Sequence, residues 1–270
     1  MEAEQERQQK WATLESILKG MASVLVAYSG GVDSTFLLRA AKDFLGAENV
    51  LAVIAASPTY PHSEQEEAVR LAREMGVKYL VIESHELEDP DFASNPPDRC
   101  YFCKKELFSK LVGIAKQRGL NCVADGANYD DLDDRRPGMR AAAELGVRHP
   151  LLEARLTKAD IRALSRKLHL PTWDKPSLAC LASRFPYGKP ITAGELEKIE
   201  RAENFLHALG LKQLRVRHHG EVARIEILPE DFPHILSRRE EVVAHMRELG
   251  YIYVTLDLAG YRTGSMNEML

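Results

Sequence analysis

Two groups of residues in this sequence have types and spacings that suit chemistry. In RCYFCKKELF, Cys100 and Cys103 stand three positions apart beside basic residues. Such a pair is typical of a redox switch, half of a zinc site, part of an iron–sulfur site or two buried thiols. The second group is SGGVDS at residues 29–34. Paired glycines between hydroxyl side chains are typical of a turn that binds anions.

The SGGVDS stretch lies between an apolar run and a helical pattern. Its glycines let the backbone turn tightly and present N–H groups, and the N-terminus of the following helix favours negative charge. Ser29 and Ser34 add hydroxyl donors, and Asp33 is suited to hold Mg²⁺ directly or through water. The stretch matches neither GxxxxGK[ST] nor GxGxxG. A glycine turn with an Asp–Ser helix cap is the structural alternative, but the strand–turn–helix context favours phosphate binding.

The elements that must position these groups follow from the apolar pattern. Short apolar runs at 23–29, 50–57, 78–84 and 121–127 are typical of strands buried on both faces. Helical patterns that close on a glycine separate these runs, and a last helix is expected at 157–170. This alternation predicts an α/β fold with a parallel sheet wrapped by helices.

The rest of the chain has a different pattern. Residues 171–191 hold four prolines and no clear period, which predicts a long loop. Beyond this loop we expect a helix (192–210), two strands (213–220 and 221–228), one helix (229–250) and a strand (251–258). We therefore predict a first α/β domain over residues 1–176 and a small C-terminal α+β domain over residues 177–270.

Composition narrows the classes of function. The 270 residues are 45% hydrophobic and 28% charged, as expected of a globular protein with a sizeable core. A net charge of −4 argues against an extensive nucleic-acid surface. The charged N-terminal segment does not read as a signal peptide, and no run reaches the roughly 18 apolar residues of a membrane span. Four cysteines without an export signal predict the reducing cytoplasm.

The SGGVDS stretch resembles the PP-loop of the ATP pyrophosphatase superfamily. In that family the loop grips the pyrophosphate of ATP while a substrate oxygen attacks the α-phosphate, and a nitrogen or sulfur nucleophile then displaces AMP. The resemblance implies a Rossmann-like parallel five-stranded sheet, with ATP and Mg²⁺ as cofactors. It implies that ATP and its pyrophosphate bind at Ser29, Gly30, Gly31, Val32, Asp33, Ser34, Ser57 and Gly126.

Further motifs extend the resemblance over nearly the whole chain. DGANYDDLDDRRPG (125–138), SRFPYG (183–188), RVR (215–217) and DLAGYRTGSMN (257–267) together resemble the LarE family. LarE enzymes make the thiocarboxylates of the nickel-pincer nucleotide, the cofactor of lactate racemase. The resemblance implies adenylation of a carboxylate on a pyridinium dicarboxylate mononucleotide, followed by replacement of AMP with sulfur. By composition alone, the Asp-rich turn at 125–138 would be a solvated loop.

The small domain is expected to bind this substrate. Arg215 and Arg217 are two apart on a predicted strand, so both point to one face and suit a phosphate or carboxylate. Exposed arginines on an ordinary sheet face are the alternative. Lys104 is assigned to catalysis, although it and Lys105 also suit a solvated helix face. The full predicted substrate set is Arg215, Arg217, Arg224, Arg262, Ser183 and Arg184.

LarE-like proteins come in two kinds, and the cysteines bear on which one this is. One kind sacrifices the sulfur of a single cysteine before SRFPYG, and the other holds a [4Fe-4S] cluster on three cysteines. Cys100, Cys103 and Cys180 match the second kind, so we assign Cys180 to both the cluster and catalysis. Sacrifice of Cys180, a zinc site and a redox pair remain open. Cys122, inside an apolar run, is expected to be a buried structural thiol.

The expected partners are a small-molecule nucleotide substrate, other proteins of pincer-cofactor synthesis and further copies of the chain in a homo-oligomer. Three other functions stay open. A cluster-dependent tRNA thiolase predicts a basic surface or an added RNA-binding domain. An amide-forming ligase leaves the cysteines unexplained. A nucleotide sensor predicts no pyrophosphate release with any substrate.

Overall fold

The computed structural model describes residues 2–133, 137–176 and 179–262, and the chain divides into two compact units. The first unit is Met1–Glu86 with Cys100–Leu178, and the second is Leu87–Arg99 with Ala179–Leu270. The second unit therefore includes Leu87–Arg99, which the sequence placed in the first domain. Backbone bonds explain this grouping: the N–H of Gly188 donates to Asn95 O at 2.8 Å, and that of Ile191 donates to Ala93 O at 2.8 Å.

The first unit alternates strands and helices as the apolar pattern predicts. Its strands are β1 (Val24–Ala27), β2 (Val50–Ala56), β3 (Lys78–Glu83) and β4 (Cys122–Ala124). Its helices are α1 (Glu2–Met21), α2 (Val32–Leu45), α3 (His62–Glu74), α5 (Arg99–Arg118), α6 (Gly138–Glu144), α7 (Pro150–Glu153) and α8 (Lys158–Lys167).

The sheet is parallel, in the order β3-β2-β1-β4. The predicted count of five strands is wrong for the described residues, where the fifth position is a single parallel bridge between Ala124 and Arg148. Pro150 accounts for the short pairing, because it has no N–H to extend the ladder and it starts α7.

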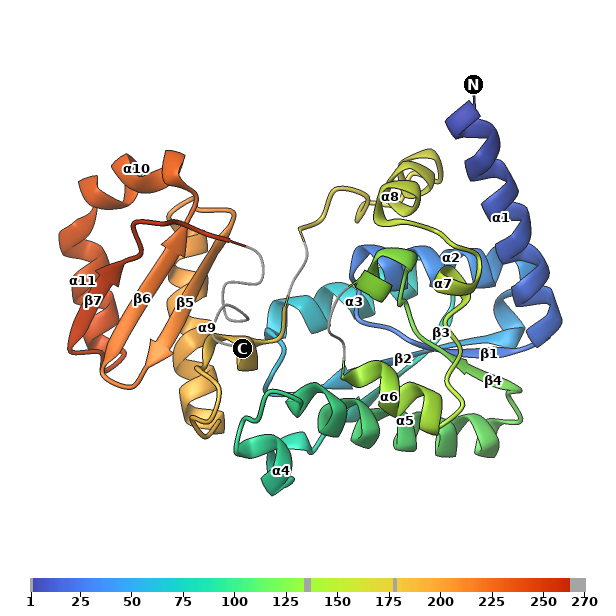
Figure 1. The fold of residues 1–270 in the computed structure, drawn as a ribbon, viewed down its shortest axis with the longest axis horizontal. Coiled ribbons are helices and arrows are strands. Elements are labelled where there is room, and N and C mark those ends of the chain that lie inside the picture. The colour runs from blue at the N-terminus through green and yellow to red at the C-terminus, as the bar shows by residue number, and fades with distance from the viewer. Residues whose placement is uncertain (1, 134–136, 177–178, 263–270) are drawn as a thin grey trace. The chain divides into compact units, whose positions relative to one another are not determined.

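Helices cover both faces of this sheet, α5 and α6 on one side and α1 and α2 on the other (Figure 1). Side chains alternate between two cores because successive strand residues point to opposite faces. Val24 and Val26 join the core under α1, α2, α3 and α8, whereas Leu25 joins the core under α5 and α6. Cys122 is only partly buried at the start of β4, so it is less enclosed than expected.

The strand order sets where a ligand can bind. The chain leaves β1 toward β2 and β3 on one side, and it later returns to place β4 on the other side. Parallel α/β sheets bind ligands at the carboxyl ends of the strands, where the order reverses. In this unit that point lies between β1 and β4. The SGGVDS stretch (residues 29–34), called the phosphate loop below, follows β1, and the Asp-rich turn follows β4.

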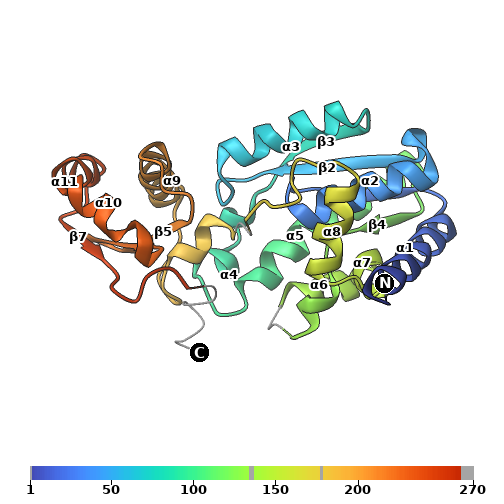
Figure 2. The same ribbon diagram turned by 90° about the horizontal axis from the view of Figure 1, so that it is seen from above.

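The second unit is a small sheet with helices on one face (Figures 1 and 2). The strands β5 and β6 are antiparallel, and β6 and β7 are parallel. One core joins the sheet to the helices, with Val216, Ile225 and Leu206 buried in it. The elements are α4 (Pro90–Ala93), α9 (Ala193–Ala208), β5 (Leu214–His219), β6 (Val222–Ile227), α10 (Phe232–Ser237), α11 (Arg239–Glu248) and β7 (Tyr253–Leu256).

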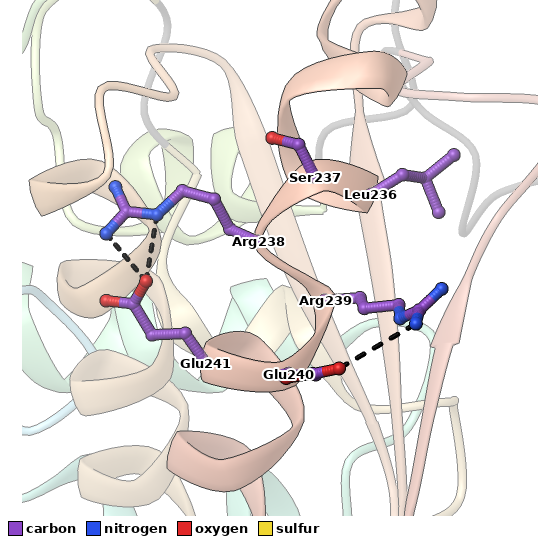
Figure 3. A pocket seen from close by; sticks show the side chains of 6 residues that line it. All are labelled: Leu236, Ser237, Arg238, Arg239, Glu240 and Glu241. Carbon is purple, nitrogen blue, oxygen red and sulfur yellow. Dashed lines mark hydrogen bonds and ion pairs between the residues drawn. The ribbon is translucent and has the colours of Figure 1, made fainter.

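The prediction of one helix over 229–250 is wrong, because the chain breaks at Arg238 into α10 and α11. The hydroxyl of Ser237 donates to His234 O at 2.7 Å, and such bonds to preceding carbonyls bend helices. The break leaves a surface hollow of about 520 Å³ lined by two ion pairs, Arg238–Glu241 and Arg239–Glu240 (Figure 3). The hollow holds none of the predicted site residues.

Among the described residues, no helix is both long enough and apolar enough to cross a membrane.

Candidate functional site

The phosphate loop has the geometry that its sequence predicts. Gly30 has a positive φ of 71°, and Gly31 precedes α2 without a capping side chain from the described residues. The first backbone N–H groups of α2 have no partners within the helix, so they are donors for an anion. Ser29 and Ser34 approach to 3.1 Å between hydroxyl oxygens at the two ends of the loop.

Close packing holds the loop from two sides. A Cβ added to Gly30 would lie 2.9 Å from the Cβ of Ala68 on α3. A Cβ added to Gly126 would lie 2.9 Å from the backbone nitrogen of Ser34. Because Gly126 follows β4, this contact brings the two strand ends together at the point where the strand order reverses.

Asp33 lies in the first turn of α2 and forms an ion pair with Lys158, the first residue of α8. Oδ2 of Asp33 accepts a hydrogen bond from Nζ of Lys158, whereas Oδ1 is buried and has no hydrogen-bond partner among the described residues. A buried carboxylate oxygen without a donor is costly, and a bound cation would satisfy it. Because Mg²⁺ prefers carboxylate oxygens and water, Asp33 fits the predicted magnesium role.

A charged cluster lies beside the phosphate loop. Asp125 directly precedes Gly126, and its Oδ1 lies 2.6 Å from Nδ1 of His149. Burial raises the pKa of Asp125, but the hydrogen bond from His149 and the charge of Lys104 outweigh it, so that pKa is lowered. Burial lowers the pKa of His149, yet the bond and charge of Asp125 raise it overall. The positive charge of Lys104 thus contributes to the lowered pKa of Asp125.

The hydroxyl of Ser57 is engaged within the first unit. It donates to Glu86, a carboxylate only 1% exposed, which also accepts from Thr59 Oγ1 at 2.8 Å. Oε2 of Glu86 is buried without a hydrogen-bond partner among the described residues. The Ser57 hydroxyl is thus occupied within the protein, and the predicted contact of Ser57 with ATP stays a prediction.

Cys100 and Cys103 occupy the first turn of α5. Residues three apart on a helix share a face, and the helix N-terminus favours thiolates. Cys100 is exposed and Cys103 is partly buried. A Cβ added to Gly138 would lie 2.8 Å from Cγ of Lys104, which fixes this lysine against the start of α6.

The second unit gathers arginines on the face of its sheet opposite the helices. Arg215 and Arg217 both point to that face, as predicted, and Arg224 lies directly across from Arg217. Facing like charges are destabilising, but Glu226, 1% exposed, pairs with Arg217 at 2.8 Å and with Arg224 at 3.0 Å. Arg262 is the last described residue, and residues 263–267 of the C-terminal motif lie outside the described residues.

Arg215 lies in a positively charged environment. Burial, and then the charge of Arg184, lower the pKa of Arg215. Among the described residues of this region, Glu203 pairs with Arg184, Glu226 pairs with Arg217 and Arg224, and Asp257 lies 3.7 Å from Arg224.

Arg184 is 1% exposed and lies at the end of a 3₁₀ turn, Leu181–Arg184, within the predicted loop. Its guanidinium makes two bonds to Glu203, at 2.9 and 2.8 Å. The remaining nitrogen donates to the carbonyls of Ala179 and Cys180 at 2.8 and 3.1 Å. It also contacts Ser183 Oγ at 2.9 Å. Arg184 thus holds the backbone of Cys180, and its predicted contact with substrate stays a prediction.

Comparison with known proteins covers both units. The NAD synthase family model matches residues 7–92. A pyridinium-3,5-bisthiocarboxylic acid mononucleotide synthase of Lactiplantibacillus plantarum is 40% identical over 97% of this chain and 95% of its own length. An uncharacterized protein of Synechocystis is 43% identical over 97% and 98%, and one of Methanocaldococcus jannaschii is 30% identical over 89% and 91%.

The chain belongs to the LarE family. The recognition from motifs and the PP-loop fold class are thereby confirmed, whereas the three-cysteine subgroup of LarE proteins is untested. Cys100 and Cys103 belong to the first unit and Cys180 to the second. Within the described residues, no three His, Cys, Asp or Glu side chains converge to hold a metal ion.

Within each unit, the sequence pattern did not indicate some residues that pair with side chains discussed above. Lys158 pairs with Asp33 from 125 positions away, and Glu203 meets Arg184 from α9. His149 meets Asp125 only because the chain returns beside β4. A lysine at a helix start, a glutamate inside a helix and a lone histidine carry no local pattern that signals these pairings.

Proposed function

We propose that the protein is an ATP-dependent sulfur transferase that converts a carboxylate of a pyridinium dicarboxylate mononucleotide into a thiocarboxylate. The phosphate loop carries this proposal, because uncapped N–H groups at the start of α2 lie against Gly126 where the strand order reverses. That arrangement favours the pyrophosphate of ATP. The relative from Lactiplantibacillus plantarum, whose name states a pyridinium bisthiocarboxylate product, supports the choice of substrate.

The first step would be adenylation. A carboxylate oxygen of the substrate attacks the α-phosphorus of ATP, and pyrophosphate leaves. The N–H groups of α2 and the hydroxyls of Ser29 and Ser34 stabilise the charge that develops on the leaving group. Asp33 would hold Mg²⁺, which neutralises phosphate charge when bound. Lys104, beside Asp125, would contact the adenylate.

The arginine face of the second unit would bind the substrate. Guanidinium groups at Arg215 and Arg217 on one face of the sheet suit the phosphate or second carboxylate of a mononucleotide. Arg217 is already paired with Glu226, so its orientation is fixed before substrate arrives. A fixed donor loses less conformational entropy on binding than a mobile one.

The second step would be sulfur transfer. A sulfur nucleophile attacks the acyl carbon of the adenylate, and AMP leaves with the bonding electron pair. Cys100, Cys103 and Cys180 would hold a [4Fe-4S] cluster, which would supply the sulfur when bound. Cys100 and Cys103, on one face near the N-terminus of α5, would supply two of the three thiolates. Sacrifice of the Cys180 sulfur is the alternative within the same reaction.

Pyrophosphate release tests the adenylation step. We expect release from ATP to depend on pyridinium-3,5-dicarboxylic acid mononucleotide, and to be lost in Asp33→Asn. Asp43→Asn is the matched control, since Asp43 lies on the same helix in an ion pair with Arg39 and should change little. Release without substrate, or unchanged release in Asp33→Asn, would contradict the proposal.

Iron analysis after anaerobic reconstitution separates the two sulfur sources. If a cluster forms, the wild type and Cys122→Ser should bind iron and sulfide, and Cys103→Ser should not. A protein that binds no iron, and whose Cys180 loses the mass of its sulfur on turnover, would support sacrifice instead.

A further inference from the structure

The turn that carries Cys180 is held by a buried ion pair. Arg184 is 1% exposed and Glu203 is 6% exposed, and both nitrogens on one edge of the guanidinium bond the carboxylate. A buried charge is costly unless its partners satisfy it, and here both charges are matched. Burial alone would lower the pKa of Arg184, but Glu203 raises it overall, so the guanidinium stays charged.

The rest of the guanidinium holds the backbone on both sides of one Cα. Nη1 of Arg184 donates to the carbonyl of Ala179 at 2.8 Å and to that of Cys180 at 3.1 Å. The first carbonyl belongs to the peptide plane before the Cα of Cys180, and the second belongs to the plane after it. Fixing both planes fixes φ and ψ of Cys180, and with them the direction of its Cα–Cβ bond.

Two further bonds secure the same turn. The N–H of Ser183 donates to the Cys180 carbonyl at 2.9 Å, which closes the turn. Arg217 donates from Nη1 to the Ser183 carbonyl at 2.9 Å. Glu203 in turn accepts the N–H of Val216 on β5 at 2.8 Å. The sulfur-bearing turn is thereby tied to the strand that carries the predicted substrate arginines.

We propose that Arg184 is a positioning residue that directs the Cys180 sulfur, and that Glu203 holds Arg184 for this purpose. This inference rests on the proposed function for the use of the sulfur, but not for its placement. It assigns Arg184 a role in the second step of the reaction, sulfur transfer, and none in adenylation.

Two substitutions test the hydrogen bonds that the Arg184 guanidinium makes to Glu203 and to the backbone around Cys180. Arg184→Lys keeps the positive charge, but one ammonium cannot bond Glu203 in two places and reach both carbonyls. Glu203→Gln keeps the volume of the side chain and leaves Arg184 without its carboxylate. If one variant fails to fold, the other still gives a result. Met246→Ala serves as the control, because Met246 is fully buried in the second unit and belongs to α11, apart from this network.

The first readout is amide hydrogen exchange of residues 179–185 in the whole protein without ligands. Loss of a bond to a charged group should speed exchange of the Ser183 amide by roughly 10- to 100-fold in both variants. Met246→Ala should instead speed exchange mainly in the helices that pack around it. Unchanged exchange at Ser183, or an equal effect of Met246→Ala there, would overturn the inference.

The second readout is a split between the two chemical steps in a single turnover. We expect substrate-dependent pyrophosphate release to persist in Glu203→Gln while thiocarboxylate formation falls by at least about tenfold, the factor for one lost bond of this type. Equal loss of both steps would contradict a positioning role. If the wild type releases no pyrophosphate, the proposed function fails, and the exchange measurement still decides the placement of Cys180.

Discussion

The contact between Gly126 and the phosphate loop can be tested with one added methyl group. In Gly126→Ala the new Cβ would lie 2.9 Å from Ser34 N and 3.2 Å from both Asp33 C and Ser34 Cα. All three are backbone atoms, so no side chain can rotate away. The φ angle of Gly126 is not positive, so alanine adds crowding without backbone strain.

The size of the effect follows from these distances. Non-bonded carbon atoms prefer separations of about 3.5–4.0 Å, so the loop must move by roughly half an ångström. Overpacking of this kind costs about 1–3 kcal/mol. If the displaced N–H groups no longer match the pyrophosphate, a loss of that size weakens ATP binding by roughly 5- to 150-fold.

The assay is calorimetric titration with ATP and Mg²⁺, combined with denaturant unfolding of the free protein. Gly113→Ala is the matched control, because Gly113 lies inside α5 with no described atom within 4 Å of an added Cβ. That variant should bind ATP normally and gain about 0.5–1 kcal/mol in stability, since glycine weakens a helix interior. Gly126→Ala with wild-type affinity and wild-type stability would refute the contact and the site built on it.

Three further predictions address the surroundings of the site. Gly30→Ala should destabilise the first unit by at least about 1 kcal/mol in denaturant unfolding, because its φ is 71° and a side chain of α3 blocks the Cβ; wild-type stability would contradict the loop conformation. The stabilisation by His149, measured as the difference in unfolding free energy from His149→Asn, depends on pH in two directions. Since the pKa of His149 is raised, this stabilisation is complete below pH 6.5 and is lost as the pH rises through the pKa of His149 in the folded protein. Since the pKa of Asp125 is lowered, the stabilisation that Asp125 contributes is present above pH 3.8 and is lost as the pH falls through the pKa of Asp125 in the folded protein. An unfolding free-energy difference that does not vary with pH would rule out the pair. Glu226→Gln should cost the second unit about 3–5 kcal/mol in unfolding experiments, because it removes the buried carboxylate that Arg217 and Arg224 share, whereas Glu240→Gln on the surface should change little, and similar values for both would contradict the buried bridge.

The sequence predicted the strands of the first unit well because each is an apolar run buried on both faces. It also predicted the position of the phosphate loop, because a tight turn at Gly30 and Gly31 depends on the residue types at those two positions. The pairing of Arg215 with Arg217 on one face followed from the period of a strand. These features depend on neighbours in sequence, which is why the pattern alone was sufficient.

Features that depend on contacts distant in sequence could not be read in this way. The fifth strand shrinks to a bridge at Arg148 because Pro150 follows, and the break at Arg238 comes directly after Ser237, whose hydroxyl bonds a preceding carbonyl. Likewise, no local pattern shows that Glu203, nineteen positions away, accepts two hydrogen bonds from Arg184. Burial and pairing depend on tertiary contacts, so the sequence pattern alone does not give them.

The most direct test of the account is mass spectrometry of the nucleotide product after a single turnover with ATP and pyridinium-3,5-dicarboxylic acid mononucleotide. The account predicts a product in which sulfur has replaced a carboxylate oxygen, formed in equal amount with AMP and pyrophosphate by the reconstituted wild-type protein. An unchanged nucleotide, or a product that carries nitrogen in place of sulfur, would contradict it.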